Sequence, residues 1–113
     1  MRLLKIVVTL ICFSLPHVVL ADFKDTSNVT VALISVWTNN GDVLVQTNPR
    51  PDISGLTCTN DYWLRLNKSE VGFDATLAML LSAHAAKHNI SVSAQDNDGD
   101  DFCRLRRVII LPN

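Results

Sequence analysis

Short apolar stretches separated by polar turns run through most of the chain. Residues 29–38 are rich in β-branched and aromatic side chains, and residues 43–47 repeat this composition after Asn40-Gly41. An Asn-Gly pair supplies the positive φ angles of a tight hairpin. The pattern predicts two antiparallel strands, with a loose polar leader over residues 22–28 before them and a surface loop over 48–57 after them.

Alternation of apolar and polar positions predicts three further strands. They cover residues 62–66, 90–94 and 104–111, and Pro112 ends the last one. A helix is predicted over residues 73–88, with Asn89 as its C-terminal stop. Its core-facing stripe contains the large residues Phe73, Leu77, Leu80, Leu81 and His84.

The opposite face of this helix carries small residues where a surface helix usually carries charged ones. These residues are Ala75, Ala78, Ser82, Ala85 and Ala86. Small side chains allow a second helix to approach, so this face is a candidate interface for self-association. The alternative is that alanine is present only because it favours helix formation.

The predicted order of elements is β-β-β-α-β-β. Five strands with one helix between the third and the fourth is the order of an OB-fold, a small five-stranded barrel. The fold class is therefore predicted to be mainly β with one helix and OB-fold-like. An open α+β sheet with the helix on one face is the alternative that this order leaves open.

The first 21 of the 113 residues have the pattern of a secretory signal peptide. Arg2 and Lys5 precede an apolar stretch over residues 6–15, and Val19 and Ala21 are small residues at the expected cleavage positions. We therefore expect a secreted or periplasmic protein, with residues 22–113 as a single domain. No membrane span is expected after cleavage.

Charge and cysteine content change once the signal peptide is removed. The whole chain has 10 basic and 11 acidic residues; without Arg2 and Lys5 the balance is 8 − 11 = −3, which argues against nucleic-acid binding. Cys12 is also lost, so two of the three cysteines remain. Cys58 and Cys103 are predicted to form a disulfide, since an exported chain meets an oxidising compartment. The alternative is a pair of free or metal-binding thiols.

Three segments carry a resemblance to a known group of proteins: Cys58-Thr-Asn-Asp-Tyr-Trp-Leu-Arg-Leu66, Phe73-Asp-Ala-Thr-Leu-Ala-Met-Leu-Leu-Ser-Ala-His84, and Cys103-Arg-Leu. Their layout resembles the B subunits of bacterial toxins, the subtilase cytotoxin B subunit in particular, and small exported proteins of Gram-negative bacteria. The resemblance implies a pentamer of OB-folds whose surface binds glycans. The subtilase-type subunits carry more cysteines, and no set of sugar-contacting residues matches position by position.

The rigid aromatic residues are the candidate ligand-binding residues. Trp37, Tyr62 and Trp63 could stack on a sugar ring or anchor an interface. Tyr62 and Trp63 point to opposite faces of a strand, so at least one of them is expected in the core. The alternative is ordinary barrel packing. The predicted function is an exported, non-enzymatic glycan-binding module acting as an oligomer; the alternative is a monomeric periplasmic interaction or inhibitor protein.

Polar clusters give little support for catalysis, a metal or a cofactor. His84 and His88 have metal-ligand spacing, but a hydrogen-bonded, partly buried pair is the favoured interpretation. Residues 96–101 contain four carboxylates, for which a solvated turn at Asp98-Gly99 is favoured over a calcium site. The arginines Arg104, Arg106 and Arg107 are expected to pair with these acids. The sequence contains no nucleophile elbow or phosphate loop, so no catalytic residue is predicted.

Overall fold

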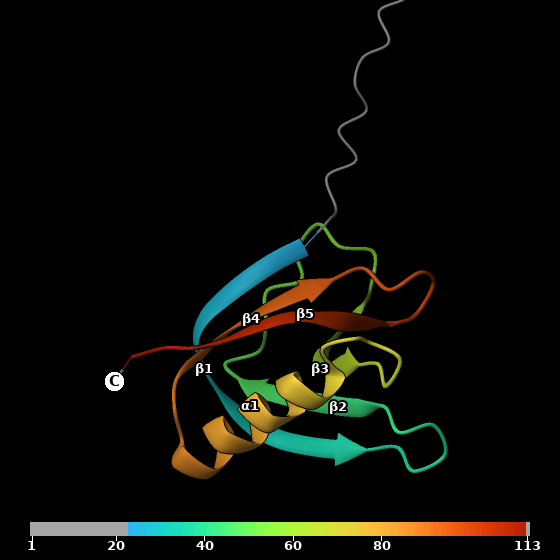
Figure 1. Cartoon of the computed structure of the whole chain (residues 1–113). Coiled ribbons are helices and arrows are strands. Elements are labelled where there is room, and N and C mark those ends of the chain that lie inside the picture. Colours follow the sequence, from blue (N-terminus) through green and yellow to red (C-terminus); the bar gives the residue numbers. More distant parts are fainter. Residues whose placement is uncertain (1–22, 113) are drawn as a thin grey trace, which may run out of the picture.

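A computed structural model describes residues 23–112 of the chain. In this part the elements, in chain order, are β1 (Phe23–Val36), β2 (Val43–Asn48), β3 (Asn60–Leu66), α1 (Phe73–Ala86), β4 (Ile90–Gln95) and β5 (Phe102–Ile110) (Figure 1). The predicted order is confirmed. The predicted signal peptide lies outside the described residues. Within residues 23–112, no helix has the length and apolar character needed to cross a membrane.

The strands close into a barrel in the order β1-β2-β3-β5-β4. Strand β1 pairs antiparallel with both β2 and β4, whereas β3 and β5 pair in parallel. Each strand therefore has two neighbours, and closure removes the exposed sheet edges that invite aggregation. The fold is an OB-fold-like barrel, and the alternative open sheet is wrong.

Strand β1 begins earlier than predicted, so the loose leader expected over residues 22–28 is wrong from Phe23 onward. Phe23 pairs with Gln95 and Thr26 with Val92, and the register shifts before Val29. Asn28, at this irregularity, has φ 60°. The polar segment is a strand because β4 supplies backbone hydrogen-bond partners, which require no apolar side chains.

Inward-facing side chains of all five strands form the core. Val29, Val43, Leu64 and Ile90 have no exposed surface. Cys58 and Cys103 are buried beside them and form the predicted disulfide, with their Cα atoms 5.2 Å apart. The disulfide joins the loop before β3 to the start of β5.

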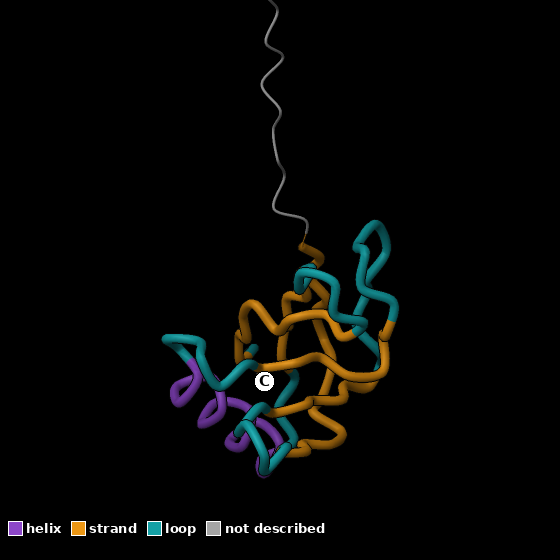
Figure 2. Tube along the Cα trace, turned by 90° about the vertical axis from the view of Figure 1, so that its right-hand side faces the viewer, coloured by secondary structure: helices purple, strands orange, loops and turns teal. Residues whose placement is uncertain are grey.

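Helix α1 lies against one side of the barrel, away from the start of β1 (Figures 1 and 2). Phe73, Leu80 and Ala83 are its buried residues. Leu81 is 51% exposed, so its predicted place in the core-facing stripe is wrong.

The helix ends at Ala86, two residues before the predicted end. Lys87 takes a left-handed conformation (φ 55°), and the His88 amide donates to the Ala83 carbonyl at 3.0 Å. This is a Schellman-type cap, which satisfies the last helical carbonyls.

Candidate functional site

An exposed aromatic and polar cluster lies at the start of β3. The ring of Tyr62 meets that of Trp63 edge-on, with centroids 5.4 Å apart. The Arg50 guanidinium lies 5.0 Å from the Tyr62 ring centroid, and Arg50 Nη1 is 3.5 Å from Asp61 Oδ1. We call Arg50, Asp61, Tyr62 and Trp63 the Tyr62 cluster. It combines a flat apolar ring with a charged donor and acceptor.

Neither aromatic residue of β3 is part of the core. Tyr62 is 39% exposed and Trp63 is half-buried, so the expectation that one of the two is buried is wrong. The core positions of this strand are instead Leu64 and Leu66. The interior of a small barrel has room for aliphatic side chains there, whereas Tyr62 and Trp63 come earlier in the strand and lie outside the core.

The contacts given below for Trp37 are with residues outside the Tyr62 cluster. It follows β1 at the predicted hairpin, where its amide donates to the Asp42 carbonyl at 2.8 Å and Gly41 has φ 82°. Its ring is 42% exposed and lies 5.7 Å from the Arg65 guanidinium. Among residues 23–112, no ring–ring contact joins Trp37 to Tyr62 or Trp63. The three predicted ligand-binding residues therefore divide into two groups.

Arg65 is a residue that the sequence analysis missed. Its Nη1 lies 2.6 Å from Asp100 Oδ2 and its Nε 3.3 Å from Asp42 Oδ2, and all three side chains are less than a quarter exposed. Burial acts to raise the pKa of Asp100, but hydrogen bonds from the Phe102 amide and from Arg65 outweigh it and lower that pKa. Arg65 thus connects the β1–β2 hairpin to the β4–β5 loop.

The acidic loop over residues 96–101 is held by protein donors. Asp96 Oδ1 accepts hydrogen bonds from the Thr57 amide at 2.6 Å and the Cys58 amide at 3.2 Å. Burial acts to raise the pKa of Asp96, but these bonds lower it overall. Gly99 has φ 77°, as the predicted turn requires. Within residues 23–112, no group of three or more His, Cys, Asp or Glu side chains is placed to hold a metal ion.

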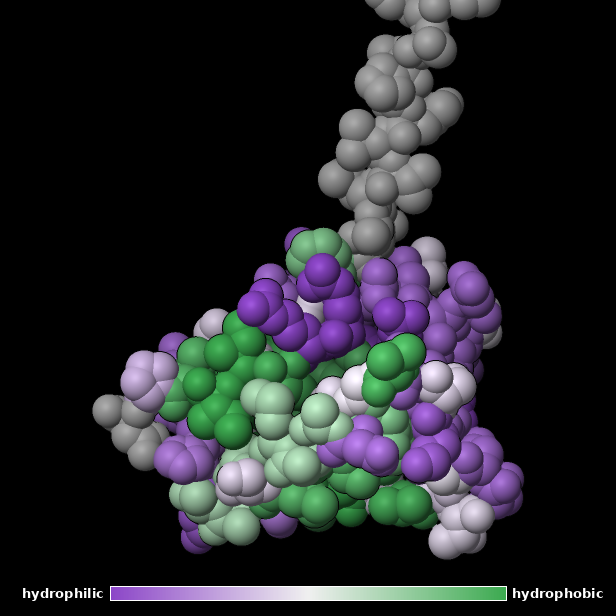
Figure 3. All heavy atoms as spheres, in the orientation of Figure 1, coloured by the Kyte–Doolittle hydropathy of each residue, from purple (hydrophilic) through white to green (hydrophobic). Residues whose placement is uncertain are grey.

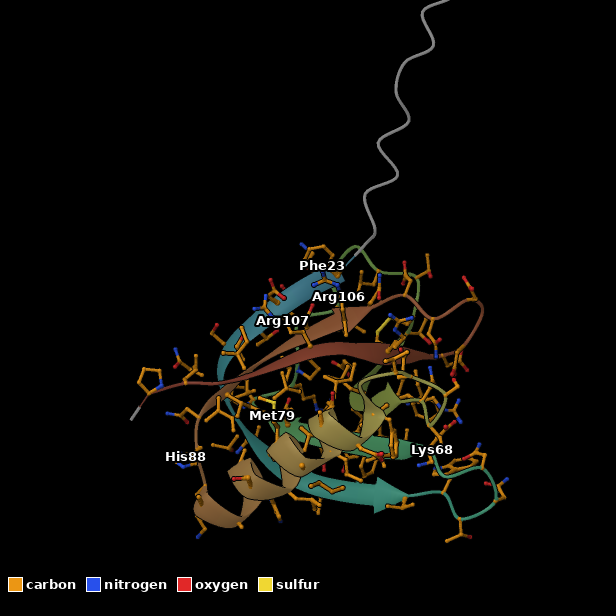
Figure 4. The ribbon with its side chains drawn as sticks, in the orientation of Figure 1. Phe23, Lys68, Met79, His88, Arg106 and Arg107 are labelled. Carbon is orange, nitrogen blue, oxygen red and sulfur yellow. A yellow bond between two sulfur atoms is a disulfide. The ribbon has the colours of Figure 1, made fainter. Side chains whose placement is uncertain are left out.

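The arginines of β5 do not pair with this loop as predicted. Arg104 Nε lies 3.1 Å from Glu70 Oε1. The Arg106 guanidinium lies 4.0 Å from the Phe23 ring centroid, and Figure 4 shows these two side chains close to Arg107 on the upper part of the barrel. The prediction fails because parallel pairing places Arg104 beside Arg65, and Arg65 is the residue that reaches Asp100.

The two histidines are not a pair on one helical face. His84 Nδ1 lies 3.0 Å from the Val31 carbonyl oxygen. Since a carbonyl only accepts, Nδ1 carries the proton in this bond. The left-handed Lys87 ends the helix before His88, which is half-buried, so the helical spacing that the prediction assumed does not extend to His88.

The predicted interface face of α1 is exposed along its whole length. All five of its small residues are exposed: Ala75, Ala78, Ser82, Ala85 and Ala86. Leu81 adds to this face, and apolar residues gather over α1 in Figure 3. Leu33 of β1, 50% exposed, is a further exposed apolar residue of the barrel.

No protein-family model matches this chain, and no curated protein sequence matches it.

Proposed function

We propose that the protein is an exported, non-enzymatic binding module that recognises carbohydrate and acts as an oligomer. The single observation that carries the proposal is the Tyr62 cluster. Sugar rings present apolar C–H faces and hydroxyl edges. An exposed aromatic ring beside a guanidinium and a carboxylate offers a surface of matching chemistry.

Export is supported by the signal-peptide pattern and by the Cys58–Cys103 disulfide. Disulfides of this kind persist in oxidising compartments and are rare in the cytosol. Oligomerisation is supported by the exposed, uncharged face of α1. Linked copies would give several weak sugar sites a useful combined affinity, because the second binding event becomes intramolecular.

Two measurements test the proposal. Light scattering gives the native mass under oxidising and then reducing conditions, and we expect several copies per particle. The labelled protein is then screened on a glycan array. Tyr62→Ala should lower binding about tenfold or more, whereas Val71→Ala, a change at a fully exposed residue outside the cluster, should not.

Two outcomes would contradict the proposal. One is that the folded protein binds no glycan on the array. The other is that the Tyr62→Ala variant binds glycans as well as the unaltered chain does. A stable monomer that captures a defined protein from a periplasmic extract would instead favour the alternative function, a monomeric interaction or inhibitor protein.

A further inference from the structure

A hollow of about 250 Å³ lies between β1 and the C-terminal end of α1. Thr30 and Val31 line it from β1, and His84 and Lys87 line it from the helix end. Its wall is mostly apolar. The hollow is open to solvent on one side, and its volume exceeds the roughly 150 Å³ of an enclosed cavity that holds a benzene ring.

Two nitrogen-bearing side chains border this apolar wall. His84 is fixed by its Nδ1 bond to the Val31 carbonyl, which leaves Nε2 as the ring nitrogen outside that bond. Lys87 supplies an ammonium group. Among the described residues, no carboxylate lies within ion-pairing distance of Lys87. Lys87 therefore brings to the border of the hollow a cation that no carboxylate of residues 23–112 pairs with.

The backbone at Lys87 adds a second argument. Lys87 has φ 55°, a conformation that glycine adopts more readily than any residue with a Cβ. A glycine would cap this helix with less strain, but it would place no cation beside the hollow. Residues whose backbone is held in such sparsely populated conformations cluster at functional sites.

The C-terminal end of α1 also lies beside the hollow. The carbonyl oxygens at a helix end carry partial negative charge and would repel one. The His88 and Lys87 amides already donate to the Ala83 and His84 carbonyls, at 3.0 and 3.4 Å. Those two carbonyls therefore already have hydrogen-bond partners, and the cation of Lys87 offsets part of the remaining negative charge at the helix end.

We propose that this hollow binds a small organic carboxylate with an apolar body, whose carboxylate meets Lys87 and whose body lies against the apolar wall of the hollow. A carboxylate carries a single negative charge and therefore matches the charge of the one ammonium that borders the hollow. The site is separate from the Tyr62 cluster and does not depend on carbohydrate binding.

Benzoate and benzamide test the proposal, because they share a shape and differ in charge. Each is titrated into the purified, disulfide-bonded protein, and the backbone amide shifts are followed by NMR. We expect benzoate to shift the amides of Val31, His84 and Lys87 saturably, with benzamide about tenfold weaker. Equal affinities, shifts centred elsewhere, or no saturable shift would overturn the proposal.

The variant Lys87→Gly separates binding from folding. Glycine suits the left-handed position, so the melting temperature should stay the same or rise. Benzoate affinity should nevertheless fall about tenfold. Arg107→Gln, at an exposed cation of β5, is the matched control and should bind benzoate as the unaltered chain does. Unchanged affinity in Lys87→Gly would show that the ammonium plays no part and would overturn the proposal.

Discussion

The guanidinium Nη1 of Arg65 lies 2.6 Å from Oδ2 of Asp100. This contact joins the C-terminal end of β3 to the loop between β4 and β5, 35 residues away in sequence. Arg65 also meets Asp42, beyond the β1–β2 hairpin turn. One cation therefore links two turns of the barrel, and its two acidic partners depend on it for charge neutralisation.

Arg65→Met should destabilise the barrel. Methionine keeps part of the apolar stem but leaves two largely buried carboxylates without their cation. We expect a loss of about 2 kcal/mol in the free energy of unfolding, less than for a fully buried pair because water reaches part of the site. Urea unfolding followed by far-UV circular dichroism measures this. Arg107→Met should change stability by less than about 0.5 kcal/mol; equal effects of the two variants would contradict the role assigned to Arg65.

Stability should fall in acid because of Asp96 and Asp100. Both pKa values are lowered below the ordinary value of 3.8 in the folded chain. Both groups therefore contribute stability above pH 3.8, and this stability is lost as the pH falls through their folded-state pKa values. Urea unfolding at a series of pH values measures this dependence.

Asp100→Asn should flatten the acid dependence, because an amide does not titrate. Asp98→Asn changes an exposed residue of the same loop and serves as the control, and it should leave the curve close to that of the unaltered chain. If Asp100→Asn keeps the full acid dependence, the attribution to Asp100 is wrong.

Removing the disulfide should cost a large part of the stability. Cys58 and Cys103 are 45 positions apart, and chain-entropy theory for a loop of this length gives about 4 kcal/mol. The double variant Cys58→Ser, Cys103→Ser should unfold at correspondingly lower urea concentration. The unaltered protein treated with a reducing agent should show a similar loss. A reduced protein as stable as the oxidised one would contradict this prediction.

A charge placed on the outer face of α1 tests self-association. Ala78→Glu keeps a good helix former at the position, so the helix itself should persist. Burying the new carboxylate against a second copy is unfavourable, and we expect the native mass from light scattering to fall to that of a monomer. Val71→Glu places the same charge just before the helix and should leave the mass unchanged. If Ala78→Glu retains the oligomer, the interface lies elsewhere.

Much of the fold could be predicted because it depends on local patterns. The alternation in residues 90–94 requires one face of a strand to be buried, and Asn40-Gly41 selects a hairpin turn. The cysteine pairing followed from their even number and the expected compartment. The helix was also found from its spacing, although Leu81 was assigned to the core and is exposed. The spacing of apolar residues predicts which side of the helix faces the core on average. The curvature of the barrel decides which residues at the edge of that side are covered by other side chains.

Local patterns determined the strands, the turn and the helix of this chain, because these depend on neighbours in sequence. The cysteine pair followed instead from the number of cysteines left after the predicted signal peptide. Only the tertiary structure decided barrel closure, since it depends on pairing between β1 and β4 and between β3 and β5. Closure makes Phe23 the start of a strand and brings Arg65 to Asp100. It also sets the end of α1 against β1, where the hollow beside Lys87 forms. Contacts between segments distant in sequence produce these features, and no periodicity along the chain encodes them.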